Sequence, residues 1–209
     1  MISIGQSPSP ALVHQIALAL NSQYELIEAG AMDGLNLSEI QSLSPCENDY
    51  PLAASLQERF LVYVSKEKLT PFIQKQIDKL EKDVAQIILL CSDRFINLKS
   101  SVPLIFPFEI LNEYIKSADF TKQIGVVVPH PGQARHASVR WSRFNVDVQC
   151  CSLQNFMPIQ FKESVIVMDC LGYSADMKKQ MISANSGEII LVRDIFLNKL
   201  KFLVGKKQA

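Results

Sequence analysis

Two of the five cysteines lie at the ends of short apolar runs. Cys91 comes after the apolar residues 87–90, and Cys170 follows 165–168 after one intervening aspartate, Asp169. Such runs are typical of strands that are buried on both faces of a parallel sheet. In open α/β sheets, ligands bind at the carboxyl ends of the strands. Each thiol is therefore predicted to lie where a ligand can reach it, and thiolate chemistry is what it offers.

A lone cysteine in a strand is usually part of the core, because free cysteine is among the most buried residue types. For either thiol alone, core packing is the better interpretation, whereas the matched pair favours function. Cys150 and Cys151 are adjacent, so they point to opposite faces of one strand, and we interpret both as core residues. Cys46 lies in a polar loop and is interpreted as incidental.

The first loop is a second candidate. Gly5, Gln6 and Ser7 lie between a predicted strand at 2–4 and a predicted helix at 11–20. Such a loop presents backbone N–H groups at a helix N-terminus, where anions bind readily. A tight β–α turn is the simpler interpretation of the loop alone. Next to two strand-end thiols, we expect its N–H groups to point into the same cleft and to bind a carboxylate or sulfate. Replacing Gly5 with Val should then weaken ligand binding more than it lowers the stability of the fold, because a side chain would block the approach of the backbone to the anion.

The elements that position these residues alternate between strands and helices with short loops. Further strands are predicted at 24–29, 103–106, 124–128, 146–150 and 188–192, with a hairpin at 52–56 and 60–64. Further helices are predicted at 39–43 after a Ser38 cap, 67–82 after a Ser65 cap, 108–117, 133–141, 175–183 and 194–204. This alternation predicts an α/β fold with mainly parallel sheets.

The two halves of the chain show the same order of elements. Each has a strand that ends in cysteine, then a connection, a short strand and a helix. We therefore predict two flavodoxin-like (Rossmann-like) lobes related by pseudo-twofold symmetry, with the two thiols in the cleft between them. The first lobe is predicted to hold residues 1–108 plus 196–209, and the second 109–195.

The composition excludes several classes of protein. The 209 residues include 21 Lys or Arg and 21 Asp or Glu, so the net charge gives no basic footprint for nucleic acid or acidic membranes. No apolar run approaches the roughly 18 residues that span a bilayer, and no signal peptide is visible. A cytoplasmic protein with reduced thiols is expected. The histidines are not spaced for a metal site, and no P-loop or dinucleotide motif occurs, so we expect neither metal nor cofactor.

Several short motifs resemble the AroM family, and the resemblance runs nearly end to end. They read IGQSP at 4–8, EAGAMDGL at 28–35, DYPL at 49–52, VPHPGQ at 128–133 and MDCLGY at 168–173. More distantly, the pair of strand-end cysteines and the two-lobed order resemble the aspartate/glutamate racemase superfamily. This resemblance implies a racemase-like fold with one cysteine of the pair in each lobe.

The superfamily resemblance also implies a reaction without cofactor. One thiolate removes the proton α to a carboxylate, and the other thiol delivers a proton to the opposite face; Cys91 and Cys170 match these positions. The carbanion needs preorganised N–H donors in a dry cleft. The ligand-binding residues implied are Gly5, Gln6, Ser7, Ser92, Asp93, Leu171, Gly172 and Tyr173. Racemases usually follow the first cysteine with Asn-Thr and the second with Thr-His, and this chain departs from both patterns.

Two functions follow as hypotheses. The first is a cofactor-independent racemase or isomerase that acts on a small carboxylate or amino-acid-like ligand through Cys91 and Cys170. The second is a non-catalytic ligand-binding or regulatory protein on the same fold, linked to aromatic amino-acid metabolism. The retained thiols favour the first, and the altered residues after them favour the second. A homodimer is left open, and neither nucleic acid nor membrane is expected as a partner.

Overall fold

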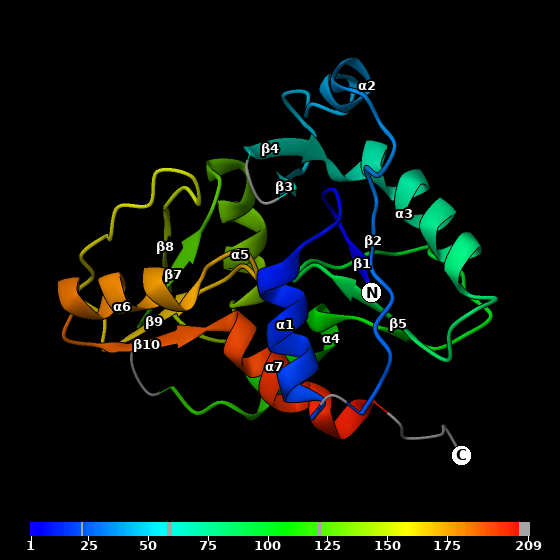
Figure 1. Ribbon diagram of the computed structural model, residues 1–209. Helices are drawn as coiled ribbons and strands as arrows, with labels where there is room; N and C mark the ends of the chain where they lie inside the picture. Colours follow the sequence, from blue (N-terminus) through cyan, green and yellow to red (C-terminus); the bar gives the residue numbers. More distant parts are fainter. Residues whose placement is uncertain (22, 58–59, 121–122, 205–209) are drawn as a thin grey trace. The chain divides into compact units, whose positions relative to one another are not determined.

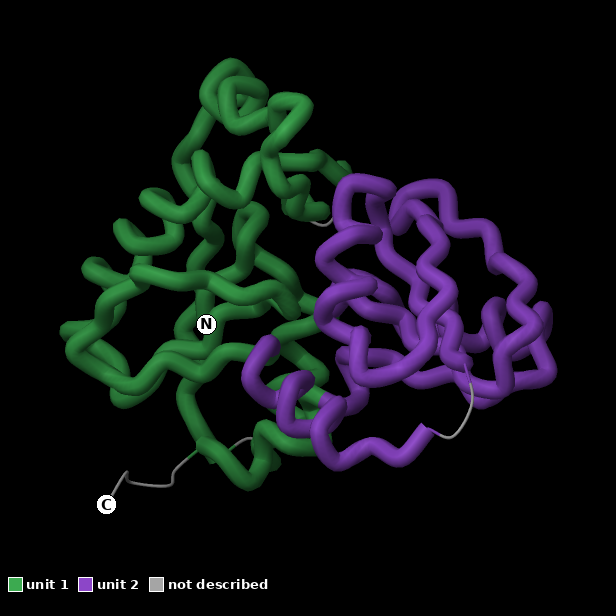
Figure 2. The backbone as a smooth tube through the Cα atoms, turned by 180° about the vertical axis from the view of Figure 1, so that it is seen from behind, with its two compact units in different colours: residues 1–107, 196–209 green, residues 108–195 purple. Residues whose placement is uncertain are grey.

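The computed structural model describes residues 1–21, 23–57, 60–120 and 123–204 (Figure 1). The chain divides into two compact units, residues 1–107 with 196–209 and residues 108–195 (Figure 2). One boundary falls after the first residue of α4 (Pro107–Ser117), and the other falls within α7 (Val192–Leu203). Residues 205–209 of the predicted first lobe lie outside the described residues.

Unit 1 is built on a parallel four-stranded sheet in the order β2-β1-β5-β6. Its strands are β1 (Ile2–Ser3), β2 (Ala29–Gly30), β5 (Ile87–Leu90) and β6 (Leu104–Ile105). Helix α3 (Lys66–Leu80) carries apolar residues at helical spacing, and it buries Leu69, Ile73 and Ile77 in one cluster with Ile2 and Leu89. This cluster fixes one face of the sheet whose strand β5 leads directly to Cys91.

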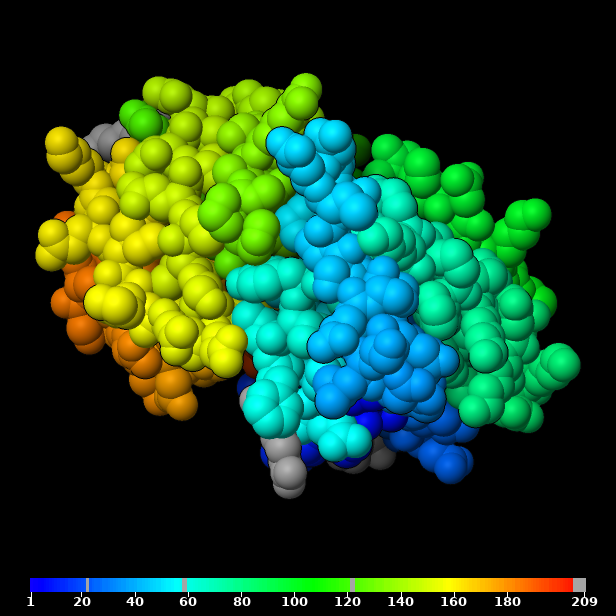
Figure 3. All heavy atoms as spheres, turned by 90° about the horizontal axis from the view of Figure 1, so that it is seen from above, coloured from blue at the N-terminus to red at the C-terminus, as the bar shows by residue number. Residues whose placement is uncertain are grey.

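The remaining elements of unit 1 are α1 (Pro10–Ala19), α2 (Leu37–Ser42) and an antiparallel hairpin of β3 (Pro51–Leu56) and β4 (Phe60–Ser65). The predicted hairpin is thus confirmed, as is the Ser65 cap of α3, whose hydroxyl accepts the N–H of Lys68. The Ser38 cap was wrong, because Asn36 caps α2 by accepting the N–H of Glu39 at 3.1 Å. In Figure 3, α2 and the hairpin, coloured light blue to cyan, form a continuous part of the surface.

The strand predicted at 24–29 is much shorter than expected. Only Ala29 and Gly30 pair with β1, through Ile2 and Ser3. The N–H of Ala29 donates to the Met1 carbonyl at 2.9 Å, and β1 extends no further in that direction. Residues 24–28 therefore have no strand partner, although their sequence favours an extended backbone.

Unit 2 holds the second parallel four-stranded sheet, in the order β10-β9-β7-β8. Its strands are β7 (Ile124–Val128), β8 (Val146–Cys150), β9 (Val165–Met168) and β10 (Glu188–Leu191). Its helices include a short 3₁₀ turn, η1 (Pro131–Gln133), then α5 (Ala134–Arg140) and α6 (Ala175–Ala184). The side chains of Ile166, Met168, Leu191, Tyr173 and Met181 form its core on one side. The prediction of an α/β fold with mainly parallel sheets is confirmed.

Within the described ranges, no helix combines the length and the apolar character that crossing a membrane requires.

Candidate functional site

Cys91 is the first residue after β5, and the loop that it opens is well packed. The Cys91 side chain is buried, and so are Ser92 and Asp93. The backbone N–H of Cys91 donates to the carbonyl of Leu89 at 2.9 Å, which turns the chain away from the sheet. Asp93 Oδ1 accepts the N–H of Arg94 at 2.6 Å, so the carboxylate stabilises the start of the loop.

Lys66 reaches this loop from the first turn of α3. Its Nζ lies 3.5 Å from Asp93 Oδ1, and it lies 5.1 Å and 5.3 Å from the ring centroids of Tyr50 and Phe95. The ammonium is thus held by one carboxylate and two aromatic faces. Nothing in the local sequence pointed to Lys66, because a lysine after a helix cap is normally a solvated surface residue.

Cys170 lies two residues beyond β9, half-buried against the core of unit 2. The backbone N–H of Gly172 donates to its Sγ at 3.3 Å. The pKa of the Cys170 thiol is raised to about 11, mainly by burial, and the neighbouring Asp169 carboxylate acts in the same direction. Three groups lower this pKa but offset only part of the increase: the Gly172 N–H, Arg193 and Arg140. Cys170 is therefore a protonated thiol at neutral pH.

Asp169, directly before Cys170, belongs to a buried ion pair. Its side chain is 1% exposed, and that of Arg140, the last residue of α5, is 8% exposed. Arg140 Nη1 donates to both carboxylate oxygens, and Trp141 Nε1 donates to Oδ2 at 2.9 Å. The Arg140 guanidinium also lies 5.5 Å from the Phe108 ring centroid. The local sequence points to neither partner of Asp169, because Arg140 and Trp141 lie 29 and 28 residues away along the chain.

A second buried arginine fixes the residue after Cys170. Arg193, in the first turn of α7, donates to the carbonyl of Leu171 through Nε at 2.7 Å and also through Nη2. Gly172 packs so closely against Leu153 that a Cβ would lie 2.6 Å from Leu153 Cδ1. The backbone of this loop is therefore set by buried contacts within unit 2.

Tyr173 was predicted to supply a donor to the ligand, and the structure corrects the state of its polar groups. Its side chain is fully buried, and its hydroxyl donates to the carbonyl of Cys151 at 2.7 Å. Its N–H donates to the carbonyl of Cys170 at 3.3 Å. Both donors of Tyr173 are therefore used within the protein, because the apolar core requires buried polar groups to be paired.

The N–H donors of Gln6 and Ser7 in the first loop are likewise used within the protein. The N–H of Gln6 donates to the carbonyl of Ser55 at 3.0 Å. The N–H and hydroxyl of Ser7 donate to the two carboxylate oxygens of Asp33, at 2.7 Å and 2.6 Å. At the N-cap of α1, the N–H of Ser9 donates to Glu28 at 2.5 Å. The chain's own carboxylates fill the anion site that the loop geometry indicated.

Gly5 is required by packing. A Cβ built at Gly5 would lie 2.0 Å from the carbonyl oxygen of Ser55 in β3. Since a carbonyl of the backbone cannot easily give way, any side chain at this position displaces the hairpin. The expected effect of Gly5→Val is therefore corrected: the substitution acts first on stability.

The predicted residues thus fall into two groups, each within one unit. In unit 1, the first loop and the Cys91 loop leave the same edge of the sheet, because Ser3 of β1 pairs in parallel with Leu90 of β5. In unit 2, residues 170–173 form one turn after β9. These placements leave the proposed ligand-binding roles as predictions.

The three remaining cysteines differ in how exposed they are to solvent. Cys151 is buried and its Sγ donates to the carbonyl of Met157 at 2.9 Å, as expected of a core residue. Cys150 is exposed, contrary to the prediction, because it points to the opposite face of the edge strand β8. Cys46 is exposed and lies 3.5 Å from Lys68 Nζ. In the part of the chain that is described, no three Cys, His, Asp or Glu side chains are grouped to hold a metal ion.

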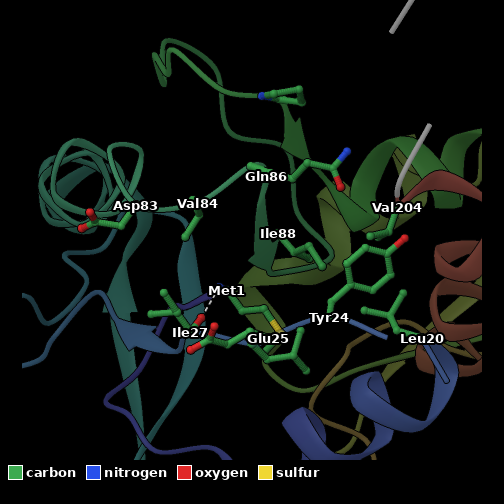
Figure 4. A pocket seen from close by; sticks show the side chains of 13 residues that line it. Met1, Leu20, Tyr24, Glu25, Ile27, Asp83, Val84, Gln86, Ile88 and Val204 are labelled. Atoms are coloured by element: carbon green, nitrogen blue, oxygen red, sulfur yellow. Dashed lines mark hydrogen bonds between the residues drawn. The ribbon is translucent and has the colours of Figure 1, made fainter. Parts of the chain in front are cut away.

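A pocket of about 530 Å³ lies within unit 1, at the end of the sheet opposite to Cys91 (Figure 4). Its lining includes residues that precede or begin the strands, such as Ile27, Gln86 and Pro103, together with the Tyr24 ring and Val204. None of the predicted site residues lines it. The pocket is therefore separate from the strand ends that carry the thiols.

Comparison with known proteins supports the resemblance. The family described as "AroM protein" matches residues 1–201. A glutamate racemase from Aquifex pyrophilus has a similar structure, with a TM-score of 0.60, 13% sequence identity, and coverage of 97% of this chain and 82% of that chain. No curated protein sequence matches this chain. At this identity, the structural similarity establishes a glutamate racemase-like fold and nothing more.

Proposed function

The chain belongs to the AroM family, and we propose that it is a cofactor-independent racemase or isomerase acting on a small carboxylate. In this proposal Cys91 supplies one thiol of the reaction and Cys170 supplies the other. The observation that carries the proposal is the placement of these two residues. Each directly follows, or nearly follows, a strand of a separate parallel four-stranded sheet in a glutamate racemase-like fold.

The proposed steps balance in protons. The Cys91 thiolate takes the proton α to the carboxylate, leaving a carbanion on the substrate and a neutral thiol on Cys91. The carbanion then takes a proton from the Cys170 thiol on its other face, leaving a thiolate on Cys170. The same two steps in reverse convert the opposite enantiomer into the first one. The pKa of about 11 at Cys170 supports its starting role as donor, since that thiol is protonated at neutral pH.

A second candidate is a ligand-binding protein without catalysis on the same fold. It is favoured by the occupied state of the residues around the thiols. Asp93 faces Lys66, the Leu171 carbonyl accepts from Arg193, and the Tyr173 hydroxyl donates to Cys151. Groups that are satisfied within the protein are less available to stabilise a carbanion.

Deuterium exchange tests the two candidates directly. The protein is incubated in D₂O with 2-amino and 2-aryl carboxylic acids, and loss of the α-proton is followed by NMR. The enzyme hypothesis expects exchange that falls at least about a hundredfold in both Cys91→Ser and Cys170→Ser. Cys46→Ser, which removes an exposed thiol, should exchange as the wild type does. Thermal stabilisation by one of these acids without any exchange would instead favour the binding protein.

A further inference from the structure

We propose that Lys66 anchors the carboxylate of the ligand beside the loop that Cys91 opens. This inference rests on the proposed function and names the anionic group that the site recognises. Lys66 is outside every motif that carries the family resemblance, and its surroundings in unit 1 indicate this role.

The position of the ammonium is well defined. Lys66 Nζ contacts the Cys91 loop at two points, 3.5 Å from Asp93 Oδ1 and 5.3 Å from the Phe95 ring centroid. These residues come two and four positions after Cys91. The centroid of the Tyr50 ring lies 5.1 Å from the same ammonium. The side chain is 21% exposed, so it is packed against these residues while part of its surface still reaches solvent.

The contacts of Lys66 leave hydrogen-bonding capacity. An ammonium carries three N–H donors. The two aromatic rings attract its charge, and a separation of 3.5 Å from Asp93 exceeds the 2.7–2.9 Å typical of a charge-assisted hydrogen bond. Among the described residues, no acceptor lies in hydrogen-bond geometry with Lys66 Nζ. A carboxylate oxygen from a ligand would complete this coordination.

Lys68, two residues further along the same helix, shows the contrast. Its Nζ donates to the carbonyl of Ser44 at 2.7 Å and approaches Cys46 Sγ at 3.5 Å. It also lies 3.8 Å from Asp49 Oδ2. Its donors are directed to protein groups, and its side chain is 37% exposed. Lys68 is thus a matched control for the same residue type on the same helical turn.

The surroundings also indicate the charge of the ligand. Asp93 partly neutralises Lys66, so a dianion such as phosphate meets repulsion that a single carboxylate feels less. The ammonium binds as a point charge rather than as a planar fork, and it therefore tolerates carboxylates of different shapes. The class of ligand expected here is a monocarboxylate.

The test compares iodoacetate with its neutral analogue iodoacetamide. In both reactions a thiolate sulfur attacks the CH₂ group, a C–S bond forms, and iodide leaves. The rate at Cys91 is measured by peptide mass spectrometry on the folded protein. We expect Lys66→Met to slow iodoacetate about tenfold while changing iodoacetamide less than about twofold. Lys66→Arg should retain the preference of the wild type. Lys68→Met should leave the ratio at Cys91 unchanged.

The two proposals fail in different ways. If both reagents react with Cys91 but the ratio of their rates survives Lys66→Met, the role of Lys66 is overturned and the two-thiol reaction is not. If neither reagent reacts with native Cys91 although both react in urea, the two-thiol reaction is overturned. Lys66 is then judged by thermal stabilisation with acetate against acetamide at matched ionic strength. Stabilisation by acetate alone that is lost in Lys66→Met supports its role, and any other pattern overturns it.

Discussion

Arg140 donates through Nη1 to both carboxylate oxygens of Asp169, at 2.8 Å and 3.0 Å. Asp169 is the residue directly before Cys170. Both side chains are almost fully buried. Removal of one partner from such a pair leaves a charge without compensation in a low-dielectric interior, which costs far more than losing an exposed pair. The pair therefore couples the stability of unit 2 to the geometry of the Cys170 turn.

Arg140→Met should lower the free energy of unfolding by about 3–5 kcal/mol, because the Asp169 carboxylate stays buried and loses its charged partner, while the Trp141 Nε1 donor remains at 2.9 Å. Urea unfolding followed by circular dichroism measures the change. Lys179→Met is the control, since Lys179 and Asp176 form an exposed pair and its loss should leave the urea midpoint unchanged. Equal midpoints for Arg140→Met and the wild type would contradict the importance of the buried pair.

The pKa of about 11 at Cys170 predicts a pH profile for its reactivity. Because only the thiolate attacks, the rate of iodoacetamide labelling should rise about tenfold per pH unit from 7 to 10 without levelling off. In urea the same cysteine should level off above its free pKa of roughly 8.5. The raised pKa also means that the neutral thiol favours folding. This contribution is complete below roughly pH 8.5 and is lost as the pH rises through about 11. A plateau near pH 8.5 in the folded protein would contradict the shift.

Local sequence patterns predicted the elements well and their long-range partners poorly. The sequence shows features that act within a few residues, such as the apolar runs of β5, β7 and β9 and the Ser65 cap of α3. Arg140 and Asp169 are 29 residues apart, and only the folded chain brings them together. The same holds for Ser7 and Asp33, whose contact turned an apparent anion site into an occupied one. Strand length also depends on a partner, which is why residues 24–28 do not form a strand.

Tyr173→Phe separates a structural role of the hydroxyl from a role in binding. The substitution removes the donor to the Cys151 carbonyl, so the unfolding free energy should fall by about 1–2 kcal/mol. Affinity for any carboxylate that stabilises the wild type should not change, because the hydroxyl is directed into the core. Tyr24→Phe alters a tyrosine that is 42% exposed and should change stability by less than about 0.5 kcal/mol. Loss of ligand affinity in Tyr173→Phe without loss of stability would restore the original prediction.

Substitution of two glycines in unit 1 compares the stability cost of a steric clash with that of a left-handed backbone conformation. At Gly5 a Cβ would lie 2.0 Å from the Ser55 carbonyl oxygen, whereas at Gly34 no heavy atom lies within 4 Å of a Cβ but φ is +79°. Gly5→Ala must displace β3 and should cost about 2–3 kcal/mol. Gly34→Ala incurs only the left-handed backbone cost of about 1 kcal/mol. Urea unfolding of the two variants under one set of conditions gives the comparison. A cost at Gly5 no greater than that at Gly34 would mean that the hairpin yields easily, and Gly5 would regain its predicted place as a residue chosen for ligand approach.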